Sequence, residues 1–221
     1  MHYQHFKQRD PAVLKALIEA YPFATIMASG SGAPVVAQAP LTFKEDSGGN
    51  GEVEFHLAKE NPISEYLLGG AKITILVSGP SAHISPSWYT ARFPGDNPDR
   101  SKTAPTYNYI SASLNGAVKI MDMGQLTSQI SDLVSAHEPK NGWKMQEIDP
   151  AMFSKLCGLI TGFRMQIESF DMTAKLSQEQ NKADMAGIIA GLKKRGGAGD
   201  MAMAKIIETF DGTGQSLIKG L

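Results

Sequence analysis

Four short clusters of polar and aromatic residues are the parts of this sequence best suited to chemistry. Together they supply lysine cations, hydroxyl and amide donors and aromatic rings, which are the groups that a phosphorylated aromatic ligand needs. Each cluster lies at an end of a predicted strand, where sites on β-barrels tend to form. The clusters are HLAKENP at 56–62, ISPSWY at 84–89, PTYNY at 105–109 and KLSQ at 175–178.

The candidate binding residues in these clusters differ in chemical type. They are the cations Lys59 and Lys175, the hydroxyls of Ser85, Ser87 and Thr106, the amides of Asn61 and Asn108, and the aromatic rings of Trp88, Tyr89, Tyr107 and Tyr109. Taken singly, several of them also have a structural interpretation. Asn61 is placed to cap a helix, Ser177 and Gln180 have the spacing of a capping box, and aromatic residues commonly belong to a core.

Other kinds of site find no support in the sequence. The histidines are scattered and Cys157 is the only cysteine, so we predict no metal site. No phosphate-binding glycine motif follows a predicted strand, and the glycine-rich stretch at 47–51 fits the tip of a hairpin. No serine stands in a nucleophile elbow, so the sequence identifies no catalytic residue.

The spacing of apolar residues predicts the elements that hold the clusters. Strands are predicted at 23–29, 34–43, 53–57, 71–78, 82–85, 107–121 and 159–170, with a turn at Gly79-Pro80. Helices are predicted to begin at Asp10-Pro11, Asn61-Pro62, Asp122, Pro150 and Ser177, and a weaker helical pattern follows Gly196. Residues 90–104 are predicted to form a surface loop, which is a common border of a site.

Strands separated by turn residues, with helices at the edges, favour an antiparallel barrel over a parallel α/β sheet. We therefore predict a mainly β protein with peripheral helices, of the α+β class. Residues 1–195 are predicted to form the barrel domain, and residues 196–221 a C-terminal helical extension. The apolar face of that extension, with Ile206, Ile207 and Phe210, is a candidate to enlarge a dimer interface.

The composition limits the partners and the compartment. The 221 residues carry a formal net charge of −1, so the chain has no basic excess that would favour nucleic acid or anionic lipid. Lys193-Lys194-Arg195 is a short basic run of the kind that usually ends a solvated helix. A single cysteine, together with the lack of a signal-peptide or membrane-span pattern, predicts a cytoplasmic protein.

The four clusters, in this order, resemble the signatures of the PaiB-type FMN-binding split-barrel proteins, which are related to the pyridoxamine-phosphate-oxidase-like proteins. The similarity runs from His5-Phe6 to about Leu192. It implies a six-stranded antiparallel split β-barrel that pairs into a homodimer. It also implies FMN as the cofactor, bound in a groove at the subunit interface.

The resemblance assigns roles to residues by matching position. It implies that His56, Lys59 and Asn61 lie near the ribityl-phosphate end, that Ser85, Ser87 and Trp88 line the groove near the ring, and that Thr106, Asn108, Lys175 and Gln178 close the groove. Tyr107 stands where the family commonly has tryptophan, which keeps an aromatic wall. Glu179 stands where asparagine is usual and puts a negative charge near the proposed phosphate site.

Three functions are consistent with these observations. The leading hypothesis is a flavoprotein that performs redox chemistry on a small molecule, with the cofactor carrying the reaction. The second is regulation, because PaiB-type proteins are named as negative regulators of protease synthesis and sporulation; the low net charge favours an indirect role over DNA binding. The third is a haem-handling protein, for which the candidate axial ligands are His2, His5, His56, His83 and His137.

Overall fold

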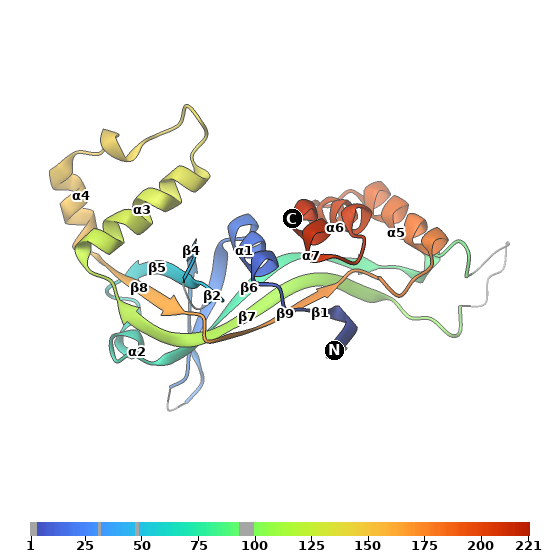
Figure 1. Ribbon diagram of the computed structural model, residues 1–221, viewed down its shortest axis with the longest axis horizontal. Coiled ribbons are helices and arrows are strands. Elements are labelled where there is room, and N and C mark those ends of the chain that lie inside the picture. Colours follow the sequence, from blue (N-terminus) through green and yellow to red (C-terminus); the bar gives the residue numbers. More distant parts are fainter. Residues whose placement is uncertain (1–3, 31, 47–48, 93–99) are drawn as a thin grey trace. The chain divides into compact units, whose positions relative to one another are not determined.

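The computed structural model of the chain describes residues 4–30, 32–46, 49–92 and 100–221 (Figure 1). Its contacts divide the chain into two compact units. The terminal unit comprises residues 1–20, 78–112 and 171–221, and the central unit comprises residues 21–77 and 113–170.

The central unit is built on antiparallel strand pairs with an apolar core. Its complete strands are β2 (Phe23–Ala28), β3 (Val35–Pro40), β4 (Thr42–Lys44), β5 (Glu52–Ala58) and β8 (Ile160–Gln166). β2 pairs with β3 and with the first half of β6 (Lys72–Ile84), and β8 pairs with β5 and with the end of β7 (Thr106–Ile120). Phe55 lies opposite Phe163 with both rings fully buried, as the alternation along each strand predicts.

Helices of the central unit follow β5 and β7 in the chain. They are α2 (Ser64–Leu68), α3 (Met123–His137), the 3₁₀ turn η3 (Met145–Glu147) and α4 (Pro150–Cys157). Asp122 and Gln125 form the capping box that begins α3, and the Asp149 side chain caps α4. A small apolar cluster of Met121, Leu126 and Cys157 packs beneath these two helices.

The terminal unit carries most of the remaining helices. Its elements are η1 (Gln4–Phe6), β1 (Lys7–Gln8), α1 (Pro11–Ala20), η2 (Pro86–Trp88), α5 (Lys182–Arg195), α6 (Ala198–Thr209) and α7 (Gly214–Gly220), with most of β9 (Ser169–Lys175). β1 pairs with β9 in antiparallel register, and α6 packs against both α5 and α7. Ile206 and Ile207 are buried inside this unit, whereas Phe210, the third residue of the predicted apolar face, is partly exposed.

The strand order confirms the mainly antiparallel α+β class. The strands follow the order β3-β2-β6-β7-β8-β5-β4, with β9 beside β7 and β1 beside β9. The predicted count of six strands is approximate, because among the described residues the sheet has nine strands and does not close.

Two predicted strand boundaries are wrong for reasons that lie in packing. β6 runs without a turn through Gly79-Pro80. A Cβ atom on Gly79 would lie 2.9 Å from Leu17 Cδ1 and 3.2 Å from the Ile110 carbonyl oxygen, so this glycine permits close packing and does not form a turn. The strand predicted at 34–43 is interrupted at Leu41, whose N–H bonds to the Pro22 carbonyl at 2.9 Å.

The C-terminal third differs from the prediction in a similar way. The strand predicted at 159–170 ends at Gln166, and the unpredicted strand β9 follows it. α5 begins at Lys182 rather than at Ser177, because the Asn181 side chain accepts the Asp184 N–H at 2.9 Å. Of the predicted loop at 90–104, residues 93–99 lie outside the described residues.

Candidate functional site

The predicted site residues divide between the two units. His56, Lys59 and Asn61 belong to the central unit, whereas the clusters at 84–89, 105–109 and 175–178 belong to the terminal unit. The terminal-unit clusters lie at the end of β6, the start of β7 and the end of β9.

Lys175 is the most unusual member of the terminal-unit group. It is the last residue of β9 and is only 5% exposed, and its Nζ donates a hydrogen bond to Thr106 Oγ1 at the first residue of β7. Within the described part of the chain, no carboxylate pairs with this ammonium. A buried charge without a counter-charge is costly, so the position is suited to a ligand that brings an anion.

Asn108 and Ser177 form a buried polar pair two residues further along the same strand ends. Ser177 Oγ lies 2.9 Å from Asn108 Nδ2 and 3.2 Å from Asn108 Oδ1. Ser177 has a φ of 60°, which is uncommon for a residue other than glycine. A buried side chain on such a backbone is a frequent mark of a functional site, and the sequence interpretation treated Ser177 only as a helix cap.

Gln178 has a local structural role. Its Oε1 accepts the Leu176 N–H at 2.7 Å, and its Nε2 donates to the Ala174 carbonyl at 2.9 Å. The side chain therefore holds the turn that places Ser177. Glu179, the expected source of unfavourable charge, is exposed.

Ser85 and Ser87 lie around the 3₁₀ turn η2. Ser85 Oγ caps this turn by accepting the Ser87 N–H at 3.2 Å. Ser87 Oγ accepts a hydrogen bond from Arg100 Nη1 at 3.1 Å. Arg100 is therefore a cation close to the cluster that sequence reasoning missed, because it lies within the segment assigned to a loop.

Trp88 packs against α5. Any Cβ on Gly191 would clash with the indole ring, and one on Gly187 would clash with the Trp88 carbonyl. The Arg195 guanidinium lies 5.0 Å from the ring centroid, in cation–π range. Tyr107, by contrast, is 59% exposed and meets the His83 ring edge-on at 5.7 Å.

Arg195 joins several of these groups, although the sequence showed it only as part of a basic run. Its Nη2 donates to the His83 carbonyl at 2.8 Å, and its Nε donates to Asp200 Oδ2 at 2.7 Å. The hydrogen bond from Arg195 holds the pKa of Asp200 below its usual value, and the same bond raises the pKa of Arg195. The pair fixes the guanidinium above Trp88.

Asp184 ties the segment after Trp88 to α5. Its Oδ1 accepts the N–H groups of Ala91 at 3.0 Å and Arg92 at 3.3 Å, and its Oδ2 accepts from Asn181 at 2.7 Å. Burial acts to raise the pKa of Asp184, but these hydrogen bonds outweigh it and the pKa is lowered. Burial also raises the pKa of Tyr89, beneath the Arg92 guanidinium.

In the central unit, His56 is oriented by a buried glutamine of α3. His56 Nδ1 lies 2.8 Å from Gln129 Oε1, and Gln129 Nε2 donates to Thr42 Oγ1 at 3.2 Å. With the amide in this orientation, Nδ1 carries the proton and Nε2 keeps a free lone pair in the neutral ring. Lys59 is exposed. Asn61 Oδ1 accepts the Ile63 N–H at 3.2 Å, so Asn61 holds the turn before α2, and this helix begins at Ser64 rather than at the predicted Asn61-Pro62.

Glu54 is a further buried charged group of the central unit. It is 1% exposed and pairs with Arg164 from β8, while its Oε2 has no hydrogen-bond partner among the described residues. Glu54 lies within the strand predicted at 53–57. Among the residues that the structure describes, no group of three His, Cys, Asp or Glu side chains is placed to hold a metal, and no helix could cross a membrane.

Comparison with known proteins identifies the family of the chain. The family model described as "Putative FMN-binding domain" matches residues 1–169. The chain belongs to this FMN-binding family. Its cofactor is accordingly FMN, and the PaiB-type resemblance is confirmed, since protease synthase and sporulation protein PAI 2 of Bacillus subtilis (strain 168) is 23% identical over 93% of this chain and 95% of that protein.

Solved structures share the fold of this FMN-binding family member. The flavocytochrome Anf3 from Azotobacter vinelandii matches with a TM-score of 0.61 and 16% identity, over 84% of this chain and 77% of that chain. The FAD and heme binding protein from Mycobacterium smegmatis matches with a TM-score of 0.55 and 16% identity, over 82% and 79%. At this level of identity the similarity shows the fold alone.

The donor set of the terminal unit fits the cofactor of the FMN-binding family. FMN carries a phosphate, and Lys175 is a buried cation without a carboxylate partner in the described residues. The hydroxyl of Thr106 next to it adds a hydrogen-bond donor to the same place. A cation and a hydroxyl together are a common phosphate-binding pair.

Proposed function

We propose that this protein is an FMN-dependent oxidoreductase acting on a small molecule. The observation that carries the proposal is the buried ammonium of Lys175, which pairs with no carboxylate among the residues that the structure describes, in a chain of the FMN-binding family. FMN, when bound, supplies the electron transfer, and the protein's part is to hold and orient the cofactor. No proton-donating side chain is required of the protein for that role.

In the terminal unit, the proposed FMN-binding groups have distinct tasks. Lys175 and Thr106 neutralise and hydrogen-bond an anionic group of the cofactor, while Asn108, positioned by Ser177, offers an amide. Tyr107 presents an exposed ring, and Trp88 presents the part of its ring that α5 leaves uncovered. Ser85, Ser87 and Gln178 hold the backbone of these segments.

In the central unit, we assign His56, Lys59 and Asn61 to FMN as a separate group. Gln129 fixes the His56 ring so that Nε2 is an acceptor. Lys59 supplies an exposed cation, and Asn61 orders the turn that follows β5. The proposal further places FMN in a groove between two copies of the chain, so FMN addition should shift the protein toward dimer in sedimentation velocity.

The first test is the visible spectrum of the purified protein before and after FMN addition and desalting. Oxidised flavin bands that stay with the protein establish binding, and their bleaching by NADH, NADPH or another reductant establishes redox activity. Bound flavin that no reductant bleaches at a useful rate would contradict the enzyme. Failure to retain any flavin would contradict the assigned binding groups as well.

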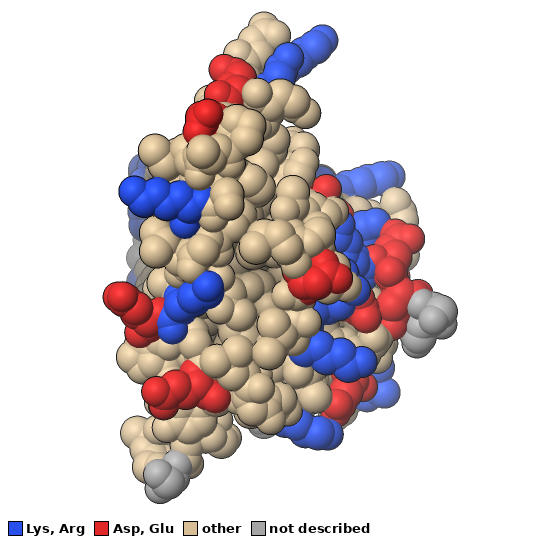
Figure 2. Space-filling model, turned by 90° about the vertical axis from the view of Figure 1, so that its left-hand side faces the viewer, with Lys and Arg blue, Asp and Glu red and all other residues tan. Residues whose placement is uncertain are grey.

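A second candidate function is regulation, which the name of the Bacillus subtilis relative favours. We propose that such regulation would not involve direct DNA binding. In the basic run, Lys193 pairs with Glu208 and Arg195 with Asp200, so both cations are already engaged. On the face drawn in Figure 2, acidic and basic side chains are interspersed rather than gathered into one basic patch. Salt-sensitive, sequence-selective binding to a promoter fragment would overturn this view.

A haem-handling role is tested by the visible spectrum of the protein during a haem titration. Of the two structural neighbours, the Mycobacterium smegmatis protein is named as FAD and heme binding, and the Azotobacter vinelandii protein is named as a flavocytochrome. In this chain, His56 is a candidate axial ligand because its Nε2 keeps a lone pair. A Soret band after haem titration that disappears in His56→Ala would support the role, and no band in the unmodified protein would remove it.

A further inference from the structure

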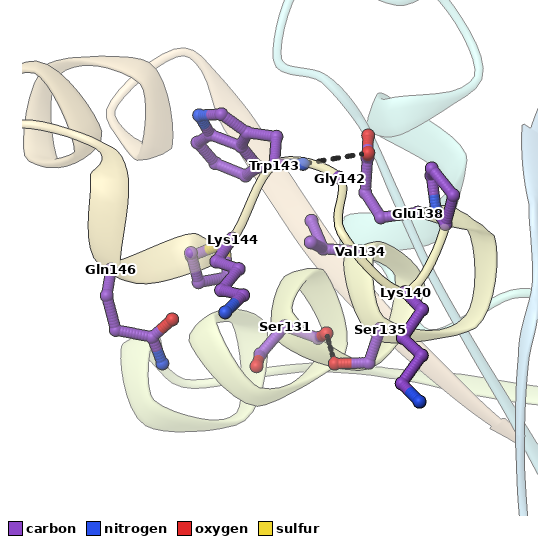
Figure 3. A pocket seen from close by; sticks show the side chains of 11 residues that line it. Ser131, Val134, Ser135, Glu138, Lys140, Gly142, Trp143, Lys144 and Gln146 are labelled. Atoms are coloured by element: carbon purple, nitrogen blue, oxygen red, sulfur yellow. Dashed lines mark hydrogen bonds between the residues drawn. The ribbon is translucent and has the colours of Figure 1, made fainter.

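The segment that follows α3 borders a hollow of about 310 Å³ in the central unit (Figure 3). None of its lining residues belongs to the groups assigned to FMN. Its lining includes Ser131 and Ser135 on α3, and Lys140, Trp143, Lys144 and Gln146 on the segment between α3 and α4.

The rim of this hollow is held in place by hydrogen bonds. The Gly142 N–H bonds to the Pro139 carbonyl at 2.7 Å, and the Trp143 N–H bonds to Glu138 Oε2 at 3.1 Å. A Cβ on Gly142 would lie 2.7 Å from Pro139 Cδ, so a larger residue would push the turn open. The Lys144 N–H is bonded to Glu147 Oε1 at 2.8 Å. Because the rim is already ordered, a ligand would lose little free energy in organising it.

The charge of the hollow favours an anion. In the described part of the chain, the ammonium groups of Lys140 and Lys144 form no ion pair and no hydrogen bond. The lining residues that the structure describes also include Glu138, whose carboxylate accepts the Trp143 N–H, so the two ammonium groups face one carboxylate and the lining keeps a positive charge. In the view of Figure 3, the two lysines lie on either side of the α3 serines. Ser131 adds a hydroxyl to the same lining.

The size of the hollow and its tryptophan define the rest of the ligand. Trp143 is 40% exposed at the rim and offers a flat apolar face. Exposed tryptophan beside a pocket is a frequent anchor for binding, because its ring buries a large area in few rotamers. A volume of about 310 Å³ is at the small end for ligand pockets, which suits one ring rather than a nucleotide.

We propose that this hollow binds a small anion carrying a single flat ring, as an aryl phosphate or an aromatic carboxylate does. The anionic group lies between Lys140 and Lys144, with the Ser131 hydroxyl as a donor, and the ring packs against Trp143. The site shares no residue with the groups assigned to FMN.

The experiment is calorimetric titration of the FMN-saturated full chain with phenyl phosphate, benzoate and inorganic phosphate. We expect saturable binding of at least one aromatic anion and weaker binding of inorganic phosphate. Preference for phenyl phosphate or for benzoate then distinguishes the two ligand sources. The absorbance of bound FMN is recorded in the same samples, so loss of flavin is detected separately from loss of this site.

Variants locate the binding. The double substitution Lys140→Gln and Lys144→Gln should weaken binding of the aromatic anion at least about tenfold, equivalent to about 1.4 kcal/mol. Trp143→Leu should weaken binding of the aromatic anion but not of inorganic phosphate. The matched control, Lys194→Gln with Lys205→Gln, changes the net charge equally at exposed lysines of the terminal unit and should change affinity by less than about twofold.

Two results would overturn the proposal. One is the absence of saturable binding of either aromatic anion at concentrations up to about 10 mM. The other is equal weakening in the Lys140/Lys144 variant and in its charge-matched control, which would mean that net charge, and not this hollow, attracts the anion.

Discussion

At the residue scale, Lys175 combines burial, positive charge and a single hydroxyl partner in the described part of the chain. In the absence of an anion, such an ammonium lowers the stability of the folded chain, because its desolvation is not offset by a counter-charge. A bound phosphate reverses that balance. The residue should therefore affect FMN affinity and the stability of the flavin-free protein in opposite directions.

Replacing Lys175 with methionine tests this opposition. Lys175→Met should weaken FMN binding at least about tenfold, as followed by quenching of flavin fluorescence. In the flavin-free protein, the free energy of unfolding in urea should stay the same or rise by about 1–2 kcal/mol, because an apolar side chain removes the desolvation cost. Lys175→Arg keeps the charge and is the matched control. A large loss of stability in Lys175→Met would contradict the argument.

Asp184 predicts a pH dependence. Its pKa is lowered in the folded protein relative to about 3.9 in an unfolded chain. Its stabilising contribution is therefore complete above the unfolded pKa, and it is lost as the pH falls through the lower, folded pKa. Asp184→Asn should lower the free energy of unfolding at pH 7 by about 1–3 kcal/mol, because buried N–H groups lose a charged acceptor.

The measurement for Asp184 is the urea midpoint at pH 7, 5 and 3. The difference between wild type and Asp184→Asn should be the same at pH 7 and 5 and smaller at pH 3. Glu65→Gln, at an exposed position of α2, is the control and should leave all three midpoints nearly unchanged. A difference that grows at pH 3 would show that the sign of the argument is wrong.

At the scale of elements, α5 is shaped to receive η2. Gly187 and Gly191 lie one helical turn apart and face Trp88, so the helix surface is hollowed where the indole packs. This contact, and not helix propensity, explains two glycines inside a helix, each of which costs about 1 kcal/mol relative to alanine. α5 thereby sets the position of Trp88.

Gly191→Ala tests this packing. Alanine favours the helix, yet its Cβ would clash with the Trp88 ring. We expect a net loss of about 1–3 kcal/mol from overpacking, together with a shift in the tryptophan emission of a Trp143→Phe background. Gly124→Ala on α3, where a Cβ would meet only Asp122 Oδ1 at 3.3 Å, is the control and should be neutral or stabilising. A stabilised Gly191→Ala protein would refute the packing.

Element boundaries were predictable wherever a local signal decides them. The beginnings of α1, α3 and α4 follow from the caps at Asp10, Asp122 and Asp149 next to their apolar patterns. The boundaries of β6 and β9 were not predictable in this way, because Gly79 and the residues after Phe170 are held by contacts with distant segments. Glycine and proline next to each other usually mean a turn, and only the neighbouring chain shows otherwise.

At the scale of the whole molecule, the last two helices are part of a packed unit. Met203, Ile206, Ile207 and Leu217 are buried, and α7 packs against α1. Buried aliphatic side chains contribute about 1.5–3 kcal/mol each. Four of them amount to a large share of the about 5–15 kcal/mol by which an ordinary domain is stable.

Truncation after Arg195 is therefore expected to destabilise the terminal unit. The shortened chain should bind the dye ANS, lose helical circular dichroism beyond the loss of the deleted residues, and bind FMN weakly. Leu217→Ala in the full chain should give a milder loss of about 2–5 kcal/mol. A truncated protein with an unchanged melting temperature and no ANS binding would mean that α6 and α7 are a dispensable extension.

The sequence by itself determined the family, the class of fold and the four clusters, since each depends on residue types and spacings within short stretches. Only the tertiary structure decided that Lys175 is buried beside Thr106, that Ser177 has a left-handed backbone bonded to Asn108, and that Arg195 covers Trp88. These pairs are separated by 69, 69 and 107 residues. Burial and pairing across such distances arise when strands and helices pack, which no local pattern encodes.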